Sequence, residues 1–119
     1  MDKWQALHSF WNSFGIPAYD ETTVPKEAVE PYITYEAGTS SIDEVVMLTA
    51  SLWYRSSAWN SISAKSDEIA NFIGEGGVSI PYDNGRLWII RGDTFAQRMA
   101  EPSDDMIRRI VLQIYAEFQ

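Results

Sequence analysis

The chain has 119 residues, of which 45% are hydrophobic and 13% aromatic, as expected for one folded domain spanning residues 1–119. It contains no cysteine, which excludes a disulfide framework, a thiolate metal site and a thiol nucleophile. Nine basic residues against seventeen acidic ones give a formal charge of −8, which disfavours nucleic-acid binding because the protein would repel the phosphates.

The sequence shows no targeting or membrane signal. Residues 1–5 lack the basic stretch and apolar run that begin a secretory signal. No apolar run approaches the roughly 20 residues that a membrane-spanning helix requires. We therefore expect a soluble protein that has no membrane partner and is made inside the cell.

Residues 2–14 are predicted to form the first helix. Trp4, Leu7 and Trp11 recur at helical spacing, and Asp2 is a candidate N-cap residue. Gly15, followed two residues later by a proline, marks the end of this helix. Residues 16–30 contain two prolines and several acidic residues, and are expected to form a connector with an extended portion.

Two strands are predicted next, over residues 32–37 and 43–56, with a turn at 38–41. β-branched and aromatic residues fill both strands. Because strand side chains alternate between two faces, the second strand has a core face made of Val46, Leu48, Ala50, Leu52 and Tyr54. Its other face is mixed rather than polar, and carries Val45, Met47, Thr49, Ser51, Trp53 and Arg55.

A second helix and a hairpin follow. Apolar residues at helical spacing predict a helix from a cap at Ser56 or Ser57 to about Ile73, ended by the glycines of the run 74–77. Asn84-Gly85 between the β-rich runs 78–83 and 86–91 predicts a β-hairpin, because both turn positions need positive φ. Residues 92–105 are expected to form a long loop, of the kind that is usually functional or mobile.

The last segment fits two periodicities. Ile107, Ile110, Val111 and Ile114 match a helix, whereas Ile110, Leu112 and Ile114 match a strand equally well. The β-branched content and the need for another strand in the sheet favour the strand. The predicted fold class is therefore α+β, with one mixed, mainly antiparallel β-sheet and two principal helices in the order α-β-β-α-β-β-β.

No group of residues suggests catalysis. The sole histidine, His8, lies beside Trp11 on the first helix and is expected to pack there rather than act as a base. Glu101, Asp104 and Asp105 cluster, but their spacing matches no calcium loop. The glycine-rich run 74–77 follows a helix rather than a strand, which argues against a phosphate loop. We expect a protein that is not an enzyme and has no catalytic, cofactor-binding or metal-binding residues.

The predicted sheet carries more apolar surface than one core requires. Met47, Trp53, Trp88 and Ile90 fall on the face opposite the predicted core. One explanation is that the first helix covers this face, which would give a three-layer core. The other is a subunit interface, where aromatic residues and methionine are enriched. The sequence pattern leaves both explanations open.

Two stretches carry a family resemblance. Residues 31–36 (PYITYE) and 48–56 (LTASLWYRS), the second running directly into the amphipathic helix 57–73, resemble the tail terminator (tail-component, minor tail) proteins of long-tailed bacteriophages and prophages. The resemblance covers nearly the whole chain as an order of elements.

This resemblance implies a homohexameric ring at the head-proximal end of the virion tail. Such a ring stacks on the major tail tube protein, stops tube growth and offers its opposite face to a head-completion or connector protein. DNA passes through it without specific binding, and the acidic balance would keep the lumen non-adhesive. Before assembly the protein lies in the cytoplasm of the bacterial host.

If the chain forms such a ring, two groups of contact residues follow from their positions in the chain. Subunit contacts are predicted at Met47, Trp53, Trp88 and Ile90. Contacts with the neighbouring virion proteins are predicted in the loops 38–43 and 92–105, with candidate residues Thr39, Ser40, Phe95, Arg98, Met99, Asp104 and Asp105.

Two other functions remain open from the sequence. The first is another head–tail connector, neck or minor capsid component of the same kind of particle. The second is a small intracellular α+β binding domain, or an enzyme that uses carboxylates in a cleft. That second function predicts a monomer or dimer with a deep polar pocket.

Overall fold

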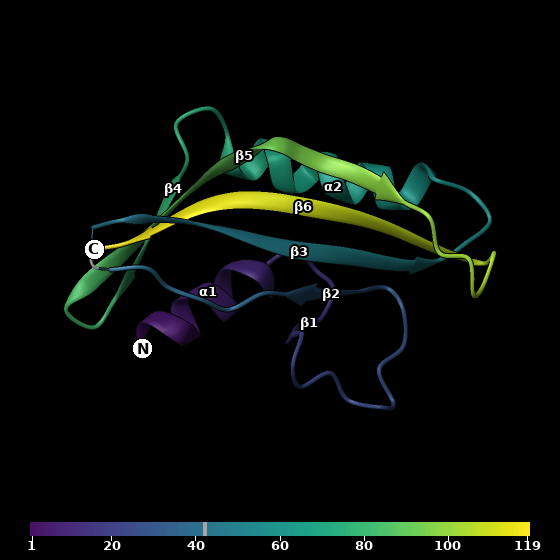
Figure 1. Ribbon diagram of the computed structural model, residues 1–119, viewed down its shortest axis with the longest axis horizontal. Helices are drawn as coiled ribbons and strands as arrows, with labels where there is room; N and C mark the ends of the chain where they lie inside the picture. The colour runs from purple at the N-terminus through teal and green to yellow at the C-terminus, as the bar shows by residue number, and fades with distance from the viewer. Residues whose placement is uncertain (42) are drawn as a thin grey trace.

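The computed structural model describes residues 1–41 and 43–119. These residues form two helices and six strands in the order α1 (Lys3–Trp11), β1 (Ala18–Asp20), β2 (Tyr32–Tyr35), β3 (Val45–Arg55), α2 (Asn60–Ile73), β4 (Val78–Tyr82), β5 (Gly85–Met99) and β6 (Ile107–Phe118). Figure 1 shows how they are arranged. Within the described residues, neither helix is long and apolar enough to cross a membrane.

All six strands belong to one sheet, in the order β1-β2-β3-β6-β5-β4. β1 pairs with β2 in parallel, and every other pair is antiparallel. The predicted α+β fold with a mixed, mainly antiparallel sheet is therefore confirmed. The observed order contains one strand more than predicted, because β1 forms within the segment that was expected to be a connector.

The neighbouring strands β3 and β6 form the centre of the sheet (Figure 1). Their antiparallel register runs without a break from Val45 opposite Glu117 to Arg55 opposite Ile107. The last segment is thus a strand, as its β-branched content favoured. Long-range pairing with β3 and β5 selects this conformation over the helix that its local pattern also fits.

One face of the sheet is buried under both helices. On β6 the buried residues alternate as Ile110, Leu112, Ile114, Ala116 and Phe118, and they share one core with residues of α1 and α2. α1 packs on β1, β4 and β5, whereas α2 packs on β3, β5 and β6. The protein therefore has two layers, and the three-layer alternative, with the first helix on the opposite face, is wrong.

A capping box fixes the first residue of α1, whereas α2 begins without a side-chain cap. The Asp2 carboxylate accepts the backbone N–H of Gln5, and the Gln5 side chain accepts the backbone N–H of Asp2, which completes a capping box. α1 then ends at Trp11, earlier than predicted. α2 begins only at Asn60, so the predicted cap at Ser56 or Ser57 is wrong: the N-cap residue is Trp59, which makes no side-chain capping hydrogen bond, and the Ser56 hydroxyl instead accepts the N–H of Ala58 in a separate turn before the helix.

The β4–β5 hairpin forms as predicted, with its turn shifted by one residue. Tyr82 pairs with Gly85, so the two turn residues are Asp83 and Asn84, and Asn84 has a φ of 65°. Gly85 is instead needed for close packing, since a Cβ there would collide with the Gln119 carbonyl and the Tyr82 ring.

The predicted long loop 92–105 is wrong for most of its length. β5 continues through an irregularity between Arg91 and Ala96 and pairs with β6 as far as Met99. Glycine and aspartate in this stretch indicate a turn by composition, but β6 provides partners that extend the strand. Only residues 100–106 connect β5 to β6.

Candidate assembly interface

The sheet face opposite the helices carries an exposed apolar group, which we call the sheet-face patch and define as Val45, Met47, Trp88, Ile90 and Tyr115. The strand register brings these residues together: Glu117 of β6 lies opposite both Val45 and Trp88, and Tyr115 lies opposite both Met47 and Ile90. Val45, Met47 and Trp88 are 57%, 51% and 43% exposed. Exposed large apolar side chains gathered on one face indicate an interaction surface.

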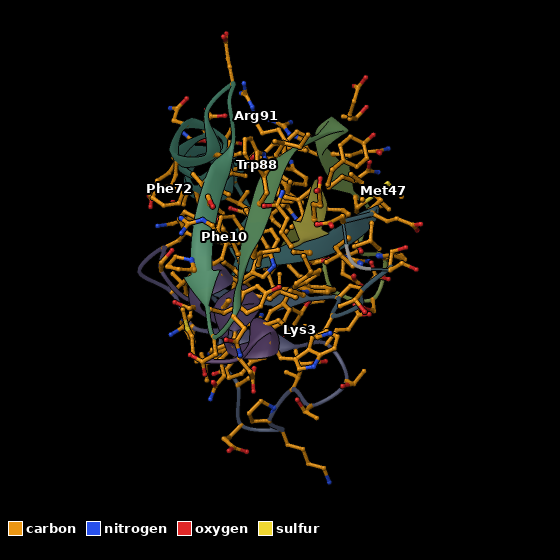
Figure 2. The ribbon with its side chains drawn as sticks, turned by 90° about the vertical axis from the view of Figure 1, so that its left-hand side faces the viewer. Lys3, Phe10, Met47, Phe72, Trp88 and Arg91 are labelled. Carbon is orange, nitrogen blue, oxygen red and sulfur yellow. The ribbon has the colours of Figure 1, made fainter. Side chains whose placement is uncertain are left out.

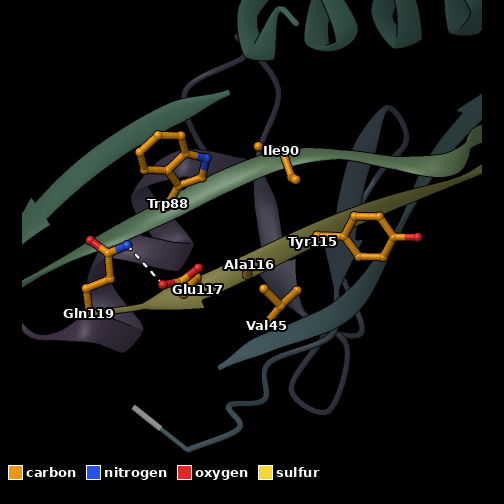
Figure 3. A pocket seen from close by; sticks show the side chains of 7 residues that line it. All are labelled: Val45, Trp88, Ile90, Tyr115, Ala116, Glu117 and Gln119. Atoms are coloured by element: carbon orange, nitrogen blue, oxygen red, sulfur yellow. Dashed lines mark hydrogen bonds between the residues drawn. The ribbon is translucent and has the colours of Figure 1, made fainter. Parts of the chain in front are cut away.

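The sheet-face patch surrounds a hollow of about 210 Å³. Figure 3 shows Trp88 and Ile90 on β5, Val45 on β3, and Tyr115 and Glu117 on β6 between them. The Glu117 carboxylate accepts a hydrogen bond of 3.0 Å from the Gln119 amide. The hollow can therefore accept an apolar group beside the Glu117–Gln119 pair, which forms the polar part of its lining between Val45 and Trp88.

Trp53, predicted to share this interface, lies on the same face but in a different cluster. It is six residues from Met47 along β3, a distance of about 20 Å. Its indole N–H donates to the Thr34 hydroxyl at 2.9 Å, and the Arg109 guanidinium lies 4.7 Å from its ring centroid. Arg109 also donates to the Ser51 hydroxyl at 3.1 Å. The structure brings Met47, Trp88 and Ile90 together and leaves Trp53 apart.

The predicted partner-facing residues Thr39 and Ser40 lie on the exposed connection between β2 and β3. The Ser40 hydroxyl donates to the Glu44 carboxylate at 3.1 Å. The predicted loop 38–43 includes residue 42, which lies outside the described residues. Because β3 starts at Val45, this connection lies at the end of the sheet that also holds the sheet-face patch.

Three other predicted partner-facing residues, Phe95, Arg98 and Met99, are part of β5 rather than of a loop. Phe95 packs against the core of its own chain. The exposed guanidinium of Arg98 lies 4.7 Å from the ring centroid of Trp59, just before α2. Met99 lies opposite Arg109, on the open face and near Trp53 rather than in the sheet-face patch.

Asp104 and Asp105 lie in the short β5–β6 connection, at the end of the sheet opposite Thr39 and Ser40. Arg55 joins this connection to the β1–β2 region, since its guanidinium nitrogens lie 3.4 Å from both the Asp104 and the Glu30 carboxylates. Among the described residues, no three His, Asp or Glu side chains are arranged to hold a metal ion.

His8 contacts Tyr35 on the helix-covered side of the sheet. Its Nδ1 lies 2.9 Å from the Tyr35 hydroxyl, and their ring centroids are 5.8 Å apart. Burial raises the pKa of the Tyr35 phenol, and the nearby Asp20 charge raises it further. This pair belongs to the packing of α1 on the sheet.

Sequence analysis did not select Tyr115 and Glu117, which line the hollow. A period-two alternation of Gln113, Tyr115 and Glu117 with the buried Ile114 and Ala116 would have found them. This alternation identifies the two residues only if the segment is a strand, and the sequence of this segment also fits a helix.

No protein-family model matches the chain, and no curated protein matches it in sequence. Among solved structures, a chain from a structure described as "Virion of native gene transfer agent (GTA) particle" has a similar fold. The TM-score is 0.67 at 16% sequence identity, and the match covers 97% of this chain and 90% of that chain. At this identity the likeness shows a shared fold over nearly the whole length of both chains.

Proposed function

We propose that this protein is a structural component of a phage-like virion, and that it assembles into a ring that ends the tail tube and joins it to the head. One observation carries the proposal: a sheet face that neither helix of the described residues covers, with Val45 and Trp88 exposed at a hollow and Met47 exposed on the same face. The fold shared with a chain of a gene transfer agent virion supports a virion role. The resemblance to tail terminators supports the more specific one.

The exposed apolar area is sufficient for association only when each subunit has more than one contact. Val45, Met47 and Trp88 are each about half exposed. Burying a whole valine or methionine side chain is worth about 1.5–3 kcal/mol, and half of a tryptophan side chain, about 100 Å², is worth about 2.5 kcal/mol, so these three half-exposed side chains offer roughly 5 kcal/mol when buried. Association costs about 4–15 kcal/mol, so a single contact is marginal. A closed ring, in which each subunit makes two contacts, is a more secure arrangement.

The flat shape of the protomer suits stacking between two partners. Its extents are 44 × 31 × 22 Å, and the β2–β3 and β5–β6 connections, which hold Thr39 and Ser40 and Asp104 and Asp105 of the predicted partner-facing loops 38–43 and 92–105, lie at opposite ends of the central strands. In the proposed ring, one end contacts the major tail tube protein and the other contacts the head-completion protein. The charge of −8 keeps DNA from adhering to the lumen.

The first test of this function is the mass of the protein in solution. Trp88→Glu places a charge in the apolar contact and is expected to reduce the assembly to monomers while the fold is retained. Val29→Glu is the matched control, because Val29 is 75% exposed and lies outside the sheet-face patch. Light scattering should show a ring for the wild type and the control. An unchanged mass for Trp88→Glu would refute the proposed interface.

The second test concerns the role in the particle. Deleting the gene from a phage or prophage that encodes this protein is expected to give overlong tails, because nothing then stops tube growth. Electron microscopy measures the tail length directly. Tails of normal length, together with DNA-filled heads that lack tails, would favour a different neck or connector component.

A further inference from the structure

A ring needs two different surfaces on each subunit. A patch that meets a copy of itself closes a two-fold dimer, whereas a patch that meets a different patch produces a ring or a filament. The following inference rests on the proposed function and concerns the second surface. It must be apolar, lie away from the sheet-face patch and be shaped to enter or cover the hollow.

The opposite side of the protomer presents such a surface around Phe72. This side chain, one residue before the end of α2, is 55% exposed. It projects from an aromatic cluster, with its ring centroid 5.4 Å from that of Phe14 and 6.3 Å from that of Phe10. Figure 2 shows Phe72 and Met47 on opposite sides of the β4–β5 hairpin.

Phe72 is held in place by its surroundings. Its ring meets that of Phe14 nearly edge-on, at an interplanar angle of 87°, and Ile80 lines the same shallow surface. A side chain fixed by packing loses little conformational freedom on binding, which favours its use as a contact. The other exposed apolar side chains fit less well: Val29 stands alone, and Trp4 packs on Phe118 of its own chain.

The hollow on the sheet face has the size and lining for a phenyl ring. Its volume is about 210 Å³, whereas an apolar protein cavity of about 150 Å³ is large enough to bind benzene. Trp88, Ile90 and Val45 line it. Tyr115 adds a further aromatic side chain, and Glu117 and Gln119 complete the lining, so a ring that enters this open hollow would rest against apolar side chains from β3, β5 and β6.

Charges beside the two surfaces are complementary. Arg86 precedes Trp88 by two residues on the same strand face, and no ion pair holds it within the described part of the chain. Glu68 lies one helical turn before Phe72, and its side chain is 53% exposed although it contacts Lys65. The two spacings are similar, at about 6.6 Å along a strand and about 6 Å along a helix.

We propose that Phe72 of one copy enters the hollow between Trp88 and Val45 of the next copy, with Glu68 of the first copy beside Arg86 of the second. The contact joins the helix-covered side of one subunit to the open sheet face of its neighbour. Each subunit then uses Phe72 in one contact and Trp88 in the other, which is the arrangement that a closed ring requires.

A mixing experiment tests this pairing. Phe72→Glu and Trp88→Glu are each expected to be monomeric, because each lacks one half of the contact. Mixed in equal amounts they keep one intact pair, so native mass spectrometry should show a 1:1 dimer and nothing larger. Circular dichroism and melting curves check that both variants fold. A Phe72→Glu variant that assembles like the wild type overturns the inference.

Cysteine crosslinking tests the same contact where association is too weak to survive dilution, and the cysteine-free chain gives no background. Oxidising the Glu68→Cys/Arg86→Cys double variant at high concentration should give a covalent ladder of oligomers on a denaturing gel. The two single variants, when mixed, should give only dimers. A double variant without a ladder overturns the pairing. If Trp88→Glu disrupts assembly while Phe72→Glu does not, the inference fails and the proposed function stands.

Discussion

We predict that Trp53 stabilises the protomer rather than the assembly, and its contacts within the chain set the size of the expected effect. Trp53→Phe keeps most of the apolar ring but removes the N–H that donates to Thr34, and it weakens the contact with the Arg109 guanidinium. A hydrogen bond contributes about 1 kcal/mol and a partly exposed cation–π contact about 0.5–1 kcal/mol. We therefore expect the free energy of unfolding to fall by about 1.5 kcal/mol.

A double-mutant cycle isolates the hydrogen bond from the other effects. Thr34→Val removes the acceptor at nearly constant volume, and the coupling between the two substitutions should be about 1 kcal/mol. Urea unfolding followed by circular dichroism measures each variant. All four proteins should carry Trp88→Glu, so that association does not contribute to their stability. A coupling near zero would refute the assignment and return Trp53 to the candidates for subunit contact.

Three further predictions concern the core, the first helix and pH. Leu112→Ala should reduce the free energy of unfolding by about 3 kcal/mol, because this fully buried side chain lies opposite two alanines that cannot fill the cavity. Urea unfolding measures this change and that of Val111→Ala on the open face. A smaller reduction for Leu112→Ala than for Val111→Ala would contradict the packing. Asp2→Ala should lower the free energy of unfolding by about 1 kcal/mol, because the helix loses its N-cap. An unchanged midpoint of urea unfolding would refute the capping box. Burial raises the pKa of the Tyr35 phenol in the folded protein, so the unfolded chain loses this proton first and stability should fall as the pH rises above about 10. Stability profiles of the wild type and Tyr35→Phe from pH 8 to 11 should diverge above pH 10, and parallel profiles would contradict the shift.

The central elements could be predicted from the sequence because their patterns are long and regular. The alternation from Val45 to Arg55 specifies a strand, and the apolar spacing before Ile73 specifies a helix. The hairpin followed from Asn84-Gly85. In each case the local preference and the final fold agree on the type of element, although the hairpin turn lies one residue earlier, at Asp83-Asn84.

Elements that depend on distant partners were harder to predict. The stretch from Gly92 to Met99 has the composition of a loop and becomes a strand because β6 pairs with it. Likewise, β1 forms only because Ile33 and its neighbours on β2 offer an edge. The sequence of a short segment does not specify which distant strand it will pair with.

The open face could be identified from the sequence only in part. Strand periodicity placed Met47, Trp53, Trp88 and Ile90 on one face, and the structure agrees. The separation of about 20 Å between Met47 and Trp53 follows from their spacing along one strand, whereas the positions of Trp88 and Ile90 beside Met47 depend on the registers of β3 and β5 against β6, which no local pattern specifies. The side on which α1 packs was also undetermined, because its apolar stripe could cover either face.

The solvent accessibility of the sheet-face patch in the assembled protein tests the central claim most directly. Hydroxyl-radical oxidation read by mass spectrometry would compare Met47 and Trp88 in the assembled wild type with Met47 in the Trp88→Glu variant. Met106, which is 43% exposed in the connection before β6, serves as an internal reference. We predict several-fold slower oxidation of Met47 in the assembly, slow oxidation of Trp88 there, and an unchanged rate at Met106. Equal rates for Met47 in the assembled and the variant protein would contradict burial of this face between copies.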